Sequence, residues 1–546
     1  MAHRLLGIEC SSSPGVVDVC CLPAKERPLP SSPMIAASPR LRAAYAESFR
    51  CIGSACEDTC CQGFTVPVEQ ATWEKYQALP PSPLQILVQA SVARAADSAG
   101  SPISSAAIVP PFATIRMNGA NQCSLLTKDR LCRIQAELGK SLLSHTCATY
   151  PRIVHSMEGV KEAALTLSCP EAARHVLLNP NLMGRAGRSE RLLAGTASQT
   201  SLAGFKVEVK APANHPIPAS ETVSSASGET AIALPANFWE IREVVLNLVR
   251  TRTYPLWQRL FLLGVFCTRL DSIARGDLQR TVPEFIADFE STVATGTLRP
   301  GMENLPMNTS SQLDVVLRLA GMMLHKSNVR PRFVECIGAF TKGIGNGPGA
   351  TLESLTAQYA GSHDRFYAPF FDRHPHIMEN FLINTIVRCQ FPFGKEGMRL
   401  GVQPAMEREF ALLTAQFALM RGLLIGTAGH YGKSFSAAHI VHTVQAATKH
   451  FEHHPEFLTM AHALLVESRM DGISGLAILL RNAGTGRPET GRGVGEARPA
   501  SEAVYAPGPQ DGRSAWADGP AGIGRPESLH RRSKVPPSHR HVRPPQ

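Results

Sequence analysis

The stretch Phe49–Phe64 reads FRCIGSACEDTCCQGF and holds four cysteines within eleven residues. Gly53 and Gly63 bracket this cluster, and glycine allows the backbone to turn tightly. Short loops between ligands reduce the entropy lost when a metal site closes, and zinc or iron can take four thiolates. The stretch therefore predicts metal binding through Cys51, Cys56, Cys60 and Cys61. The last two are adjacent, so their side chains are expected to point in different directions and need not serve the same metal atom.

Four further cysteines extend the cluster, so that eight of the chain's 14 cysteines fall between residues 51 and 169. The additional residues are Cys123, Cys132, Cys147 and Cys169. Cys169 precedes Pro170 and Glu171, an order that suits the start of a helix. A Cys-Pro pair also ends one kind of iron–sulfur ligand run. We predict that the eight thiols bind metal; structural thiols without metal and redox dithiols are the alternatives.

The spacing of the cysteines does not decide between iron and zinc. The chain has neither the Cys-x2-Cys pairs of zinc fingers nor the Cys-x3-Cys-x2-Cys run of radical enzymes that cleave S-adenosylmethionine. Eight thiols can supply two four-ligand sites, or one cluster with spare thiols. The isolated Cys267, Cys336 and Cys389 lie in apolar helical stretches and are interpreted as inert core residues.

The apolar stretches are interrupted too often for a membrane span or an export signal. The nearest candidate, Phe410–Ala428, contains Gln416 and Arg421 and therefore predicts a buried helix. Glu9 and three serines interrupt the first 22 residues, unlike a secretory signal. We predict a cytoplasmic protein without a membrane span, in which thiols stay reduced and cysteines serve as metal ligands or redox groups.

Changes of composition predict a mainly α fold in which a cysteine-rich metal-binding module packs on a multi-helix domain. The net charge is +10, and half of it lies in residues 481–546, which hold 11 Lys/Arg against 6 Asp/Glu. The dispersed charge elsewhere gives no reason to expect nucleic-acid binding. The predicted ranges are a flexible extension at 1–33, the metal module at 34–175, a variable linker at 176–235, the helical domain at 236–480 and a disordered basic tail at 481–546.

Local patterns predict individual elements in both halves of the chain. With Thr72 as N-cap, residues 72–79 are expected to form a helix. Apolar spacing predicts a helix over 84–96 and a strand over 112–117. In the second half, apolar residues at helical spacing predict helices that include 313–325, 377–387, 407–424, 437–451 and 457–468.

Three weaker signals concern single residues or a short run. Tyr150 and Arg152 follow Cys147 and are candidates for binding an anionic cofactor group, with buttressing of the metal loop as the alternative. Glu379 and Asn380 open an apolar helix and are interpreted as caps, with a role as site residues as the alternative. The run GIGNGPG, which begins at residue 343, lacks the spacing of a phosphate-binding loop and predicts a plain loop.

The chain resembles the flagellin lysine-N-methylase family in several strings. The front half carries FRCIGSACEDTCCQGF, CSLLTKDRLCRIQAELGKSLLSHTCATYPR and LTLSCPEAARHVLL, and the second half carries RTRTYPLWQRLFLLGVFC and ENFLINTIVRCQFPFG. The cysteine module is also similar to a wider group of zinc- or iron-chelating cysteine-cluster proteins. The resemblance covers roughly residues 37–480, and one departure is Phe64, where family members often have tryptophan.

The resemblance implies a protein-lysine N-methyltransferase that moves methyl groups from S-adenosylmethionine to lysine side chains of flagellin in the cytoplasm. It also implies an iron–sulfur cluster, expected as [4Fe-4S] with zinc as the alternative. The family's cysteine positions correspond to Cys51, Cys56, Cys60, Cys61, Cys123, Cys132, Cys147 and Cys169. The competing hypothesis is a non-catalytic iron–sulfur or zinc protein with an electron-transfer or structural role. Neither a catalytic base nor a donor pocket follows from the sequence.

Overall fold

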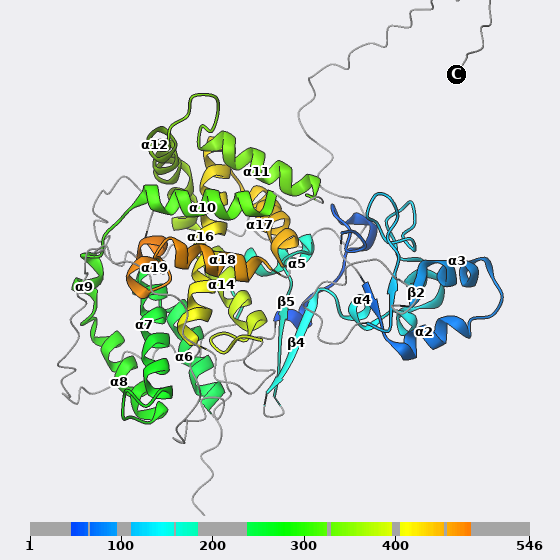
Figure 1. Ribbon diagram of the computed structural model, residues 1–546, viewed down its shortest axis with the longest axis horizontal. Coiled ribbons are helices and arrows are strands. Elements are labelled where there is room, and N and C mark those ends of the chain that lie inside the picture. The colour runs from blue at the N-terminus through cyan, green and yellow to red at the C-terminus, as the bar shows by residue number, and fades with distance from the viewer. Residues whose placement is uncertain are drawn as a thin grey trace, which may run out of the picture. The chain divides into compact units, whose positions relative to one another are not determined.

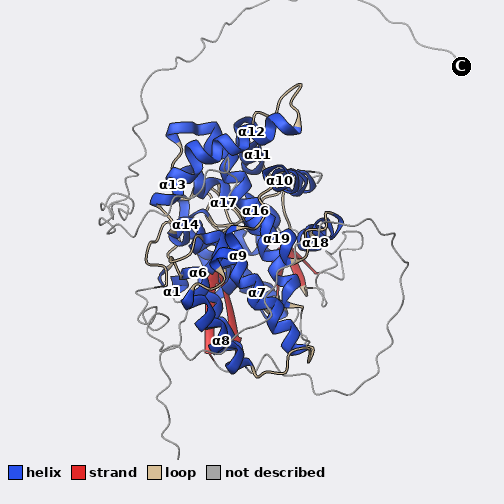
Figure 2. Cartoon of the chain, turned by 90° about the vertical axis from the view of Figure 1, so that its left-hand side faces the viewer, coloured by secondary structure: helices blue, strands red, loops and turns tan. Residues whose placement is uncertain are grey.

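The computed structural model describes residues 45–63, 66–94, 111–157, 160–183, 237–324, 329–395, 405–452 and 456–481. The predicted extension at 1–33, the predicted linker beyond residue 183 and the predicted tail beyond residue 481 lie outside these residues. The described chain is mainly helical, which confirms the main feature of the predicted fold class (Figures 1 and 2).

Helices of the second half begin and end at residues whose chemistry explains the boundaries. α8 (Val282–Thr295) follows a capping box between Thr281 and Glu284 and ends at Gly296, which adopts a left-handed conformation. α17 (Ala437–Phe451) coincides with the predicted helix at 437–451. The other helices here are α6 (Phe238–Arg250), α7 (Leu256–Ala274), α9 (Arg299–Glu303), α10 (Thr309–Leu324), α11 (Pro331–Gly343), α12 (Leu352–Ser362), α13 (Ala368–Arg373), α14 (His376–Cys389), α16 (Met406–Tyr431), α18 (Phe457–Glu467) and α19 (Ile473–Leu480).

α16 forms the centre of this helical part. It contacts helices that precede and follow it in the chain, including α7, α10, α11, α17, α18 and α19. The helical run Met406–Ser434 is long and apolar enough to cross a membrane, but its apolar window lies entirely inside the protein. A helix that is apolar all round is typical of a protein core. The buried helix predicted around Phe410–Ala428 is therefore confirmed.

The cysteine-rich part combines short helices with two small antiparallel sheets. One sheet has three strands in the order β1-β3-β2, and β4 and β5 form a separate hairpin. The elements are α1 (Tyr45–Ser48), β1 (Val66–Val68), α2 (Gln70–Gln77), α3 (Pro83–Ser91), β2 (Val92–Arg94), β3 (Ala113–Ile115), α4 (His145–Thr149), β4 (Arg152–Met157), β5 (Val160–Leu165) and α5 (Pro170–Leu177).

Local predictions in this part hold for element type more than for boundaries. The helix predicted over 72–79 is α2, whose N-cap is Glu69 and not Thr72. The helix predicted over 84–96 is α3, which begins after the Ser82 cap and ends at Ser91. The chain then continues as β2, because Val92 pairs with Ile115 of β3, and a β-branched residue suits that pairing. The prediction of helix is therefore wrong over 92–94, and residues 95 and 96 lie outside the described residues.

Two hydrophobic cores divide the buried residues. The smaller core lies within the sheet β1-β3-β2 and its helices, and includes Tyr76, Val88 and Leu125. The larger core contains the second-half helices together with α1, β5 and α5, so segments from the predicted metal module contribute to it. Within the larger core, α5 lies beside α17, as Figure 1 and the contacts between them agree.

Asn384 of α14 joins the helical part to β5. Its Oδ1 accepts hydrogen bonds from the Leu165 amide at 3.1 Å and the Tyr45 hydroxyl at 2.8 Å, and its Nδ2 donates to the Leu165 carbonyl at 2.8 Å. The amide thus satisfies three buried polar groups of the cysteine-rich part, each of which is costly to leave unpaired.

Replacing Asn384 with alanine is expected to lower the free energy of unfolding by about 2–3 kcal/mol, because it leaves these groups without that partner. Urea denaturation followed by circular dichroism measures the change. Asn304, exposed after α9, provides the matched control, and its alanine variant should change stability by less than about 0.5 kcal/mol. Equal midpoints for both variants would contradict the bridging role of Asn384.

Candidate functional site

Four of the eight predicted metal-binding cysteines lie around the smaller core. Cys123 is buried in it, and the other three are partly buried against it. The Cys123 amide donates a hydrogen bond to the Cys61 carbonyl at 2.7 Å, which places these two backbone segments side by side. We call this group the module thiols: Cys61, Cys123, Cys132 and Cys147.

The other four cysteines lie where the first cysteine loop meets the start of α5. Cys169 is the N-cap of α5, as predicted, and its Sγ accepts a hydrogen bond from the Ala172 amide at 3.5 Å. Glu57 in the loop pairs with Arg174 of α5 at 2.7 Å, which ties the two segments together. We call this group the seam thiols: Cys51, Cys56, Cys60 and Cys169.

The eight side chains are of a type that binds thiophilic metals, but their positions in the described part of the chain do not form a metal site. All eight are free cysteines. Among the residues that the structure describes, however, no three His, Cys, Asp or Glu side chains form a group that could hold a metal ion. Among the described residues, the thiols thus lie in two neighbourhoods, neither of which forms a completed set of metal ligands.

Cys60 and Cys61 connect the two groups. The neighbouring Cys61 side chain and the nearby Lys449 ammonium lower the pKa of Cys60 to about 7. The expectation that the two side chains point apart stays a prediction. Burial raises the pKa of Cys56 and Cys147 to about 11.

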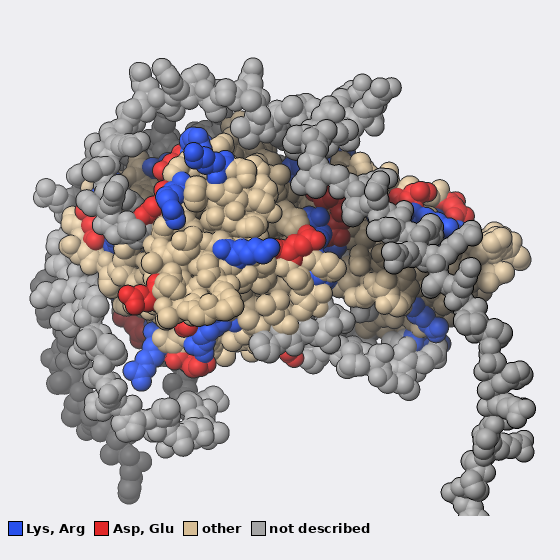
Figure 3. Space-filling model, turned by 90° about the horizontal axis from the view of Figure 1, so that it is seen from above, with Lys and Arg blue, Asp and Glu red and all other residues tan. Residues whose placement is uncertain are grey.

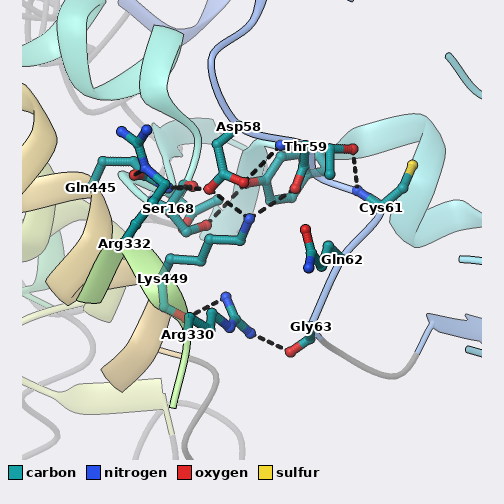
Figure 4. A network of polar contacts seen from close by, with 12 residues as sticks. Asp58, Thr59, Cys61, Gln62, Gly63, Ser168, Arg330, Arg332, Gln445 and Lys449 are labelled. Atoms are coloured by element: carbon teal, nitrogen blue, oxygen red, sulfur yellow. Dashed lines mark hydrogen bonds and ion pairs between the residues drawn. The ribbon is translucent and has the colours of Figure 1, made fainter. Parts of the chain in front are cut away.

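One face of α17 carries three polar residues that the sequence analysis did not select. Gln445 and Lys449 of α17 and Glu452, the C-cap of this helix, are spaced by four and three residues, so they lie on the same side of it. Figure 4 shows Gln445 and Lys449 directed at the cysteine loop. Lys449 Nζ contacts Asp58 Oδ2 at 2.7 Å and the Thr59 carbonyl at 2.8 Å.

Gln445 and Glu452 extend this contact to the segment before α5. Gln445 Nε2 donates to Asp58 Oδ2 at 2.8 Å and to the Ser168 carbonyl at 3.0 Å, so one amide bridges both cysteine-bearing segments. Glu452 accepts a hydrogen bond from Thr166 and pairs with Arg388 at 2.9 Å. The face of α17 therefore binds residues beside Cys60 and residues beside Cys169.

The buried charges of Asp58 and Lys449, beside the seam thiols, compensate each other. Burial alone would raise the pKa of Asp58, but the Lys449 ammonium and its hydrogen bond hold that pKa below its usual value. Burial likewise lowers the pKa of Lys449, and Asp58 opposes that shift. Arg330, which precedes α11, donates to the Gly63 carbonyl and to the Lys449 carbonyl, the latter at 3.0 Å. Both ends of the stretch around Cys60 and Cys61 are thus bound to the helical part.

Tyr150 and Arg152 bind protein groups in the structure. The Tyr150 hydroxyl lies 3.0 Å from Ser168 Oγ. Arg152 donates to the Ala46 and Phe49 carbonyls at 3.1 and 2.7 Å. These contacts correspond to the buttressing alternative, while a cofactor-binding role for the two residues stays a prediction.

Glu379 and Asn380 do not cap α14, which corrects that interpretation. Glu379 is buried and forms ion pairs with Arg259 and Arg252. Asn380 Nδ2 donates to the carbonyls of Val176 at 2.8 Å and Asn179 at 2.7 Å. Both side chains join α14 to other elements. Sequence periodicity does not reveal such partners, because they lie more than a hundred residues away.

Acidic and basic side chains alternate on the face seen in Figure 3. Lys and Arg lie in small groups beside Asp and Glu over the described residues, and no continuous basic stripe crosses the visible part of that face. A protein that tracks nucleic acid generally carries such a stripe. The expectation that nucleic acid is not a partner stays a prediction.

Parts of this chain are similar to known proteins. The sequence model of the FliB lysine N-methylase C-terminal domain matches residues 242–479, which include α14, α16 and α17. The flagellar biosynthetic protein FliU of Salmonella muenchen is 31% identical over 141 residues, which cover 26% of this chain and 78% of that protein. No solved structure matches the chain.

Two lysine-N-methylases are similar to the same extent. Those of Salmonella typhimurium strain LT2 and Salmonella choleraesuis strain SC-B67 are each 31% identical over 141 residues, which cover 26% of this chain and 33% of each relative. The match thus spans a third of the length of these two proteins. The sequence comparisons place the chain in the class of lysine N-methylases. Within it, the chain belongs to the flagellin lysine-N-methylase family.

Proposed function

We propose that this chain transfers methyl groups from S-adenosylmethionine to lysine side chains of flagellin in the cytoplasm, and that its cysteines hold an iron–sulfur cluster. One observation carries the proposal above the others. The helical domain that matches the lysine N-methylase family presents a buried polar face of α17 to both cysteine-bearing segments of the seam. A cysteine module that acted alone as a metal carrier would not need this contact.

Methylation of lysine requires the neutral amine as nucleophile. The ordinary pKa of a lysine side chain is about 10.4, so the neutral form is rare near neutral pH. Burial of the substrate amine in the enzyme, or a neighbouring base, increases its share. The positive sulfonium group of S-adenosylmethionine would also disfavour a second positive charge beside it.

The cluster is proposed on the chemistry of the donor set. Eight free cysteines lie in one region, and four-thiolate ligation is typical of iron–sulfur clusters and of structural zinc. Among the described residues the side chains do not form a completed ligand group, so the proposal names all eight cysteines and no particular four. When bound, an iron–sulfur cluster can supply a positively polarised iron corner, whereas zinc would serve to hold the fold.

The proposed activity is tested by co-expressing the chain with flagellin and measuring intact flagellin by mass spectrometry. The expected result is a mass increase of one methylene unit for each methyl group added. Cys60→Ala should abolish the increase, since this residue joins the two groups of thiols. Cys389→Ala, outside both groups, should retain it. Flagellin that stays unmodified with the unaltered chain, under anaerobic conditions with donor present, would rule out the proposal.

Metal analysis separates the enzyme from the competing carrier. Anaerobically purified protein is expected to contain iron and to absorb visible light broadly, whereas zinc has a filled d shell and gives no colour. Iron without flagellin methylation favours an electron-transfer protein, and zinc alone favours a structural role. Protein that contains neither metal and remains folded contradicts every hypothesis in which the cysteines bind metal.

A further inference from the structure

We propose that Lys449 is a positioning residue that fixes the cysteine loop around Cys60 on the helical domain, with Arg330 as its support. This inference rests on the proposed function, because it names the part of the helical domain on which the arrangement of the seam thiols depends. Lys449 Nζ contacts the Asp58 carboxylate and the Thr59 carbonyl. Its role is exerted through Asp58 and Thr59, which lie immediately before Cys60.

The surroundings of Lys449 distinguish it from an ordinary surface lysine. Its side chain is 5% exposed, and that of its partner Asp58 is 11% exposed. Burying two charges is costly, and a well-packed apolar pair is often no less stable. A buried ion pair is therefore better explained by the geometry that it imposes than by added stability. Here that geometry joins α17 to a loop nearly four hundred positions earlier in the chain.

The loop is held at both ends of its cysteine pair. Before Cys60, Lys449 binds the Asp58 carboxylate and the Thr59 carbonyl, and Gln445 binds the same carboxylate. After Cys61, Arg330 binds the Gly63 carbonyl. Arg330 also donates to the Lys449 carbonyl at 3.0 Å, so the two cations act on the loop from one rigid support (Figure 4).

The contact also fixes the loop relative to Cys169. Gln445 bonds to Asp58 and to the Ser168 carbonyl through one amide nitrogen, so a loop displaced from Lys449 would move away from the start of α5 as well. Removal of the ammonium leaves Asp58 buried with one partner fewer. The loop is then expected to open locally while the helical core, which is built from other contacts, stays folded.

The test compares Lys449→Met, which keeps the apolar stem, with Lys449→Arg, which keeps the positive charge. Amide hydrogen exchange is measured by mass spectrometry on the metal-free full chain. Exchange in peptides covering residues 56–63 should become at least about tenfold faster in Lys449→Met, with partial recovery in Lys449→Arg. Peptides of α16 should keep their exchange rates. Lys342→Met, an exposed site on α11, is the matched control and should change neither region.

A second readout follows the metal. After anaerobic reconstitution, Lys449→Met should retain several-fold less iron per chain than the unaltered protein, and Lys449→Arg should retain an intermediate amount. Unchanged exchange at residues 56–63 in Lys449→Met overturns the positioning role. If Lys449→Met does not fold, Asp58→Asn tests the same contact from the loop side. If the unaltered chain neither binds iron nor methylates flagellin, the proposed function fails, and the exchange measurement still decides the role of Lys449.

Discussion

Gly343→Ala is expected to lower the free energy of unfolding by more than about 3 kcal/mol, at the upper end of the range for overpacked cores. Gly343 is the last residue of α11, where this helix packs on α16. A methyl group at this position would overlap the carbonyl oxygen of Gly426 in α16. Because that neighbour is backbone, no side-chain rotation relieves the overlap, and the two helices must separate.

The same helix supplies the control for this prediction. Gly338 also lies within α11, but a methyl group there would meet nothing within 4 Å. Gly338→Ala should therefore stabilise the protein by about 0.4–1 kcal/mol, since alanine favours the helix and restricts the unfolded chain. Thermal and urea denaturation of both variants measures the contrast. A Gly343→Ala variant as stable as the unaltered protein would show that the close approach of the two helices is not required.

Gly343 also shows what a local reading of sequence leaves out. It opens the run GIGNGPG, which predicts a plain loop, and the residues after it do form turns. The first glycine, however, is needed for helix packing, because Gly426 and Gly429 of α16 lie against it. Its neighbours are some eighty residues further along the chain, so no pattern within the run indicates them.

Helices were predictable where the signal is local. α17 and the start of α5 follow from apolar spacing, a capping residue and a proline, all within a few positions. β2 and the β4–β5 hairpin were missed, because each strand depends on pairing. β2 has three residues and is specified mainly by its partner β3, which follows about twenty residues later. Such short strands carry too few alternating positions to be recognised alone.

The candidate site, too, could be predicted from the sequence only in part. The eight cysteines can be selected from the sequence, because their residue type and clustering indicate metal chemistry. Lys449 and Gln445 were missed, since α17 otherwise reads as an ordinary amphipathic helix. The sequence does contain polar residues spaced by four and three on a largely apolar helix, which is a signal for a polar contact. That the contact is with Asp58 and Ser168 can be learned only from the structure.

Glu379→Ala is expected to lower the free energy of unfolding by about 3–5 kcal/mol, because it leaves a buried cation without its carboxylate. Glu379 and Arg259 are each only 5% exposed, and Arg259 Nη1 lies 2.8 Å from Glu379 Oε1. The carboxylate also accepts hydrogen bonds from Arg252, at 2.7–3.1 Å. It therefore connects α14 to α7 and to the turn before it. Urea denaturation followed by tryptophan fluorescence gives the change in stability.

A double-mutant cycle identifies the cause of this loss. Adding Arg259→Met to Glu379→Ala removes the stranded charge and supplies an apolar side chain, so the double variant should be more stable than Glu379→Ala alone. The exposed pair Arg275–Asp277, with side chains 54% and 62% exposed, is the comparison, and Asp277→Ala should cost less than about 1 kcal/mol. If Glu379→Ala lowers the free energy of unfolding by no more than Asp277→Ala does, the buried network does not hold α14 in place. The position of Asn384 and Arg388, on the same helix, would then have to be set by their own contacts with β5 and α17.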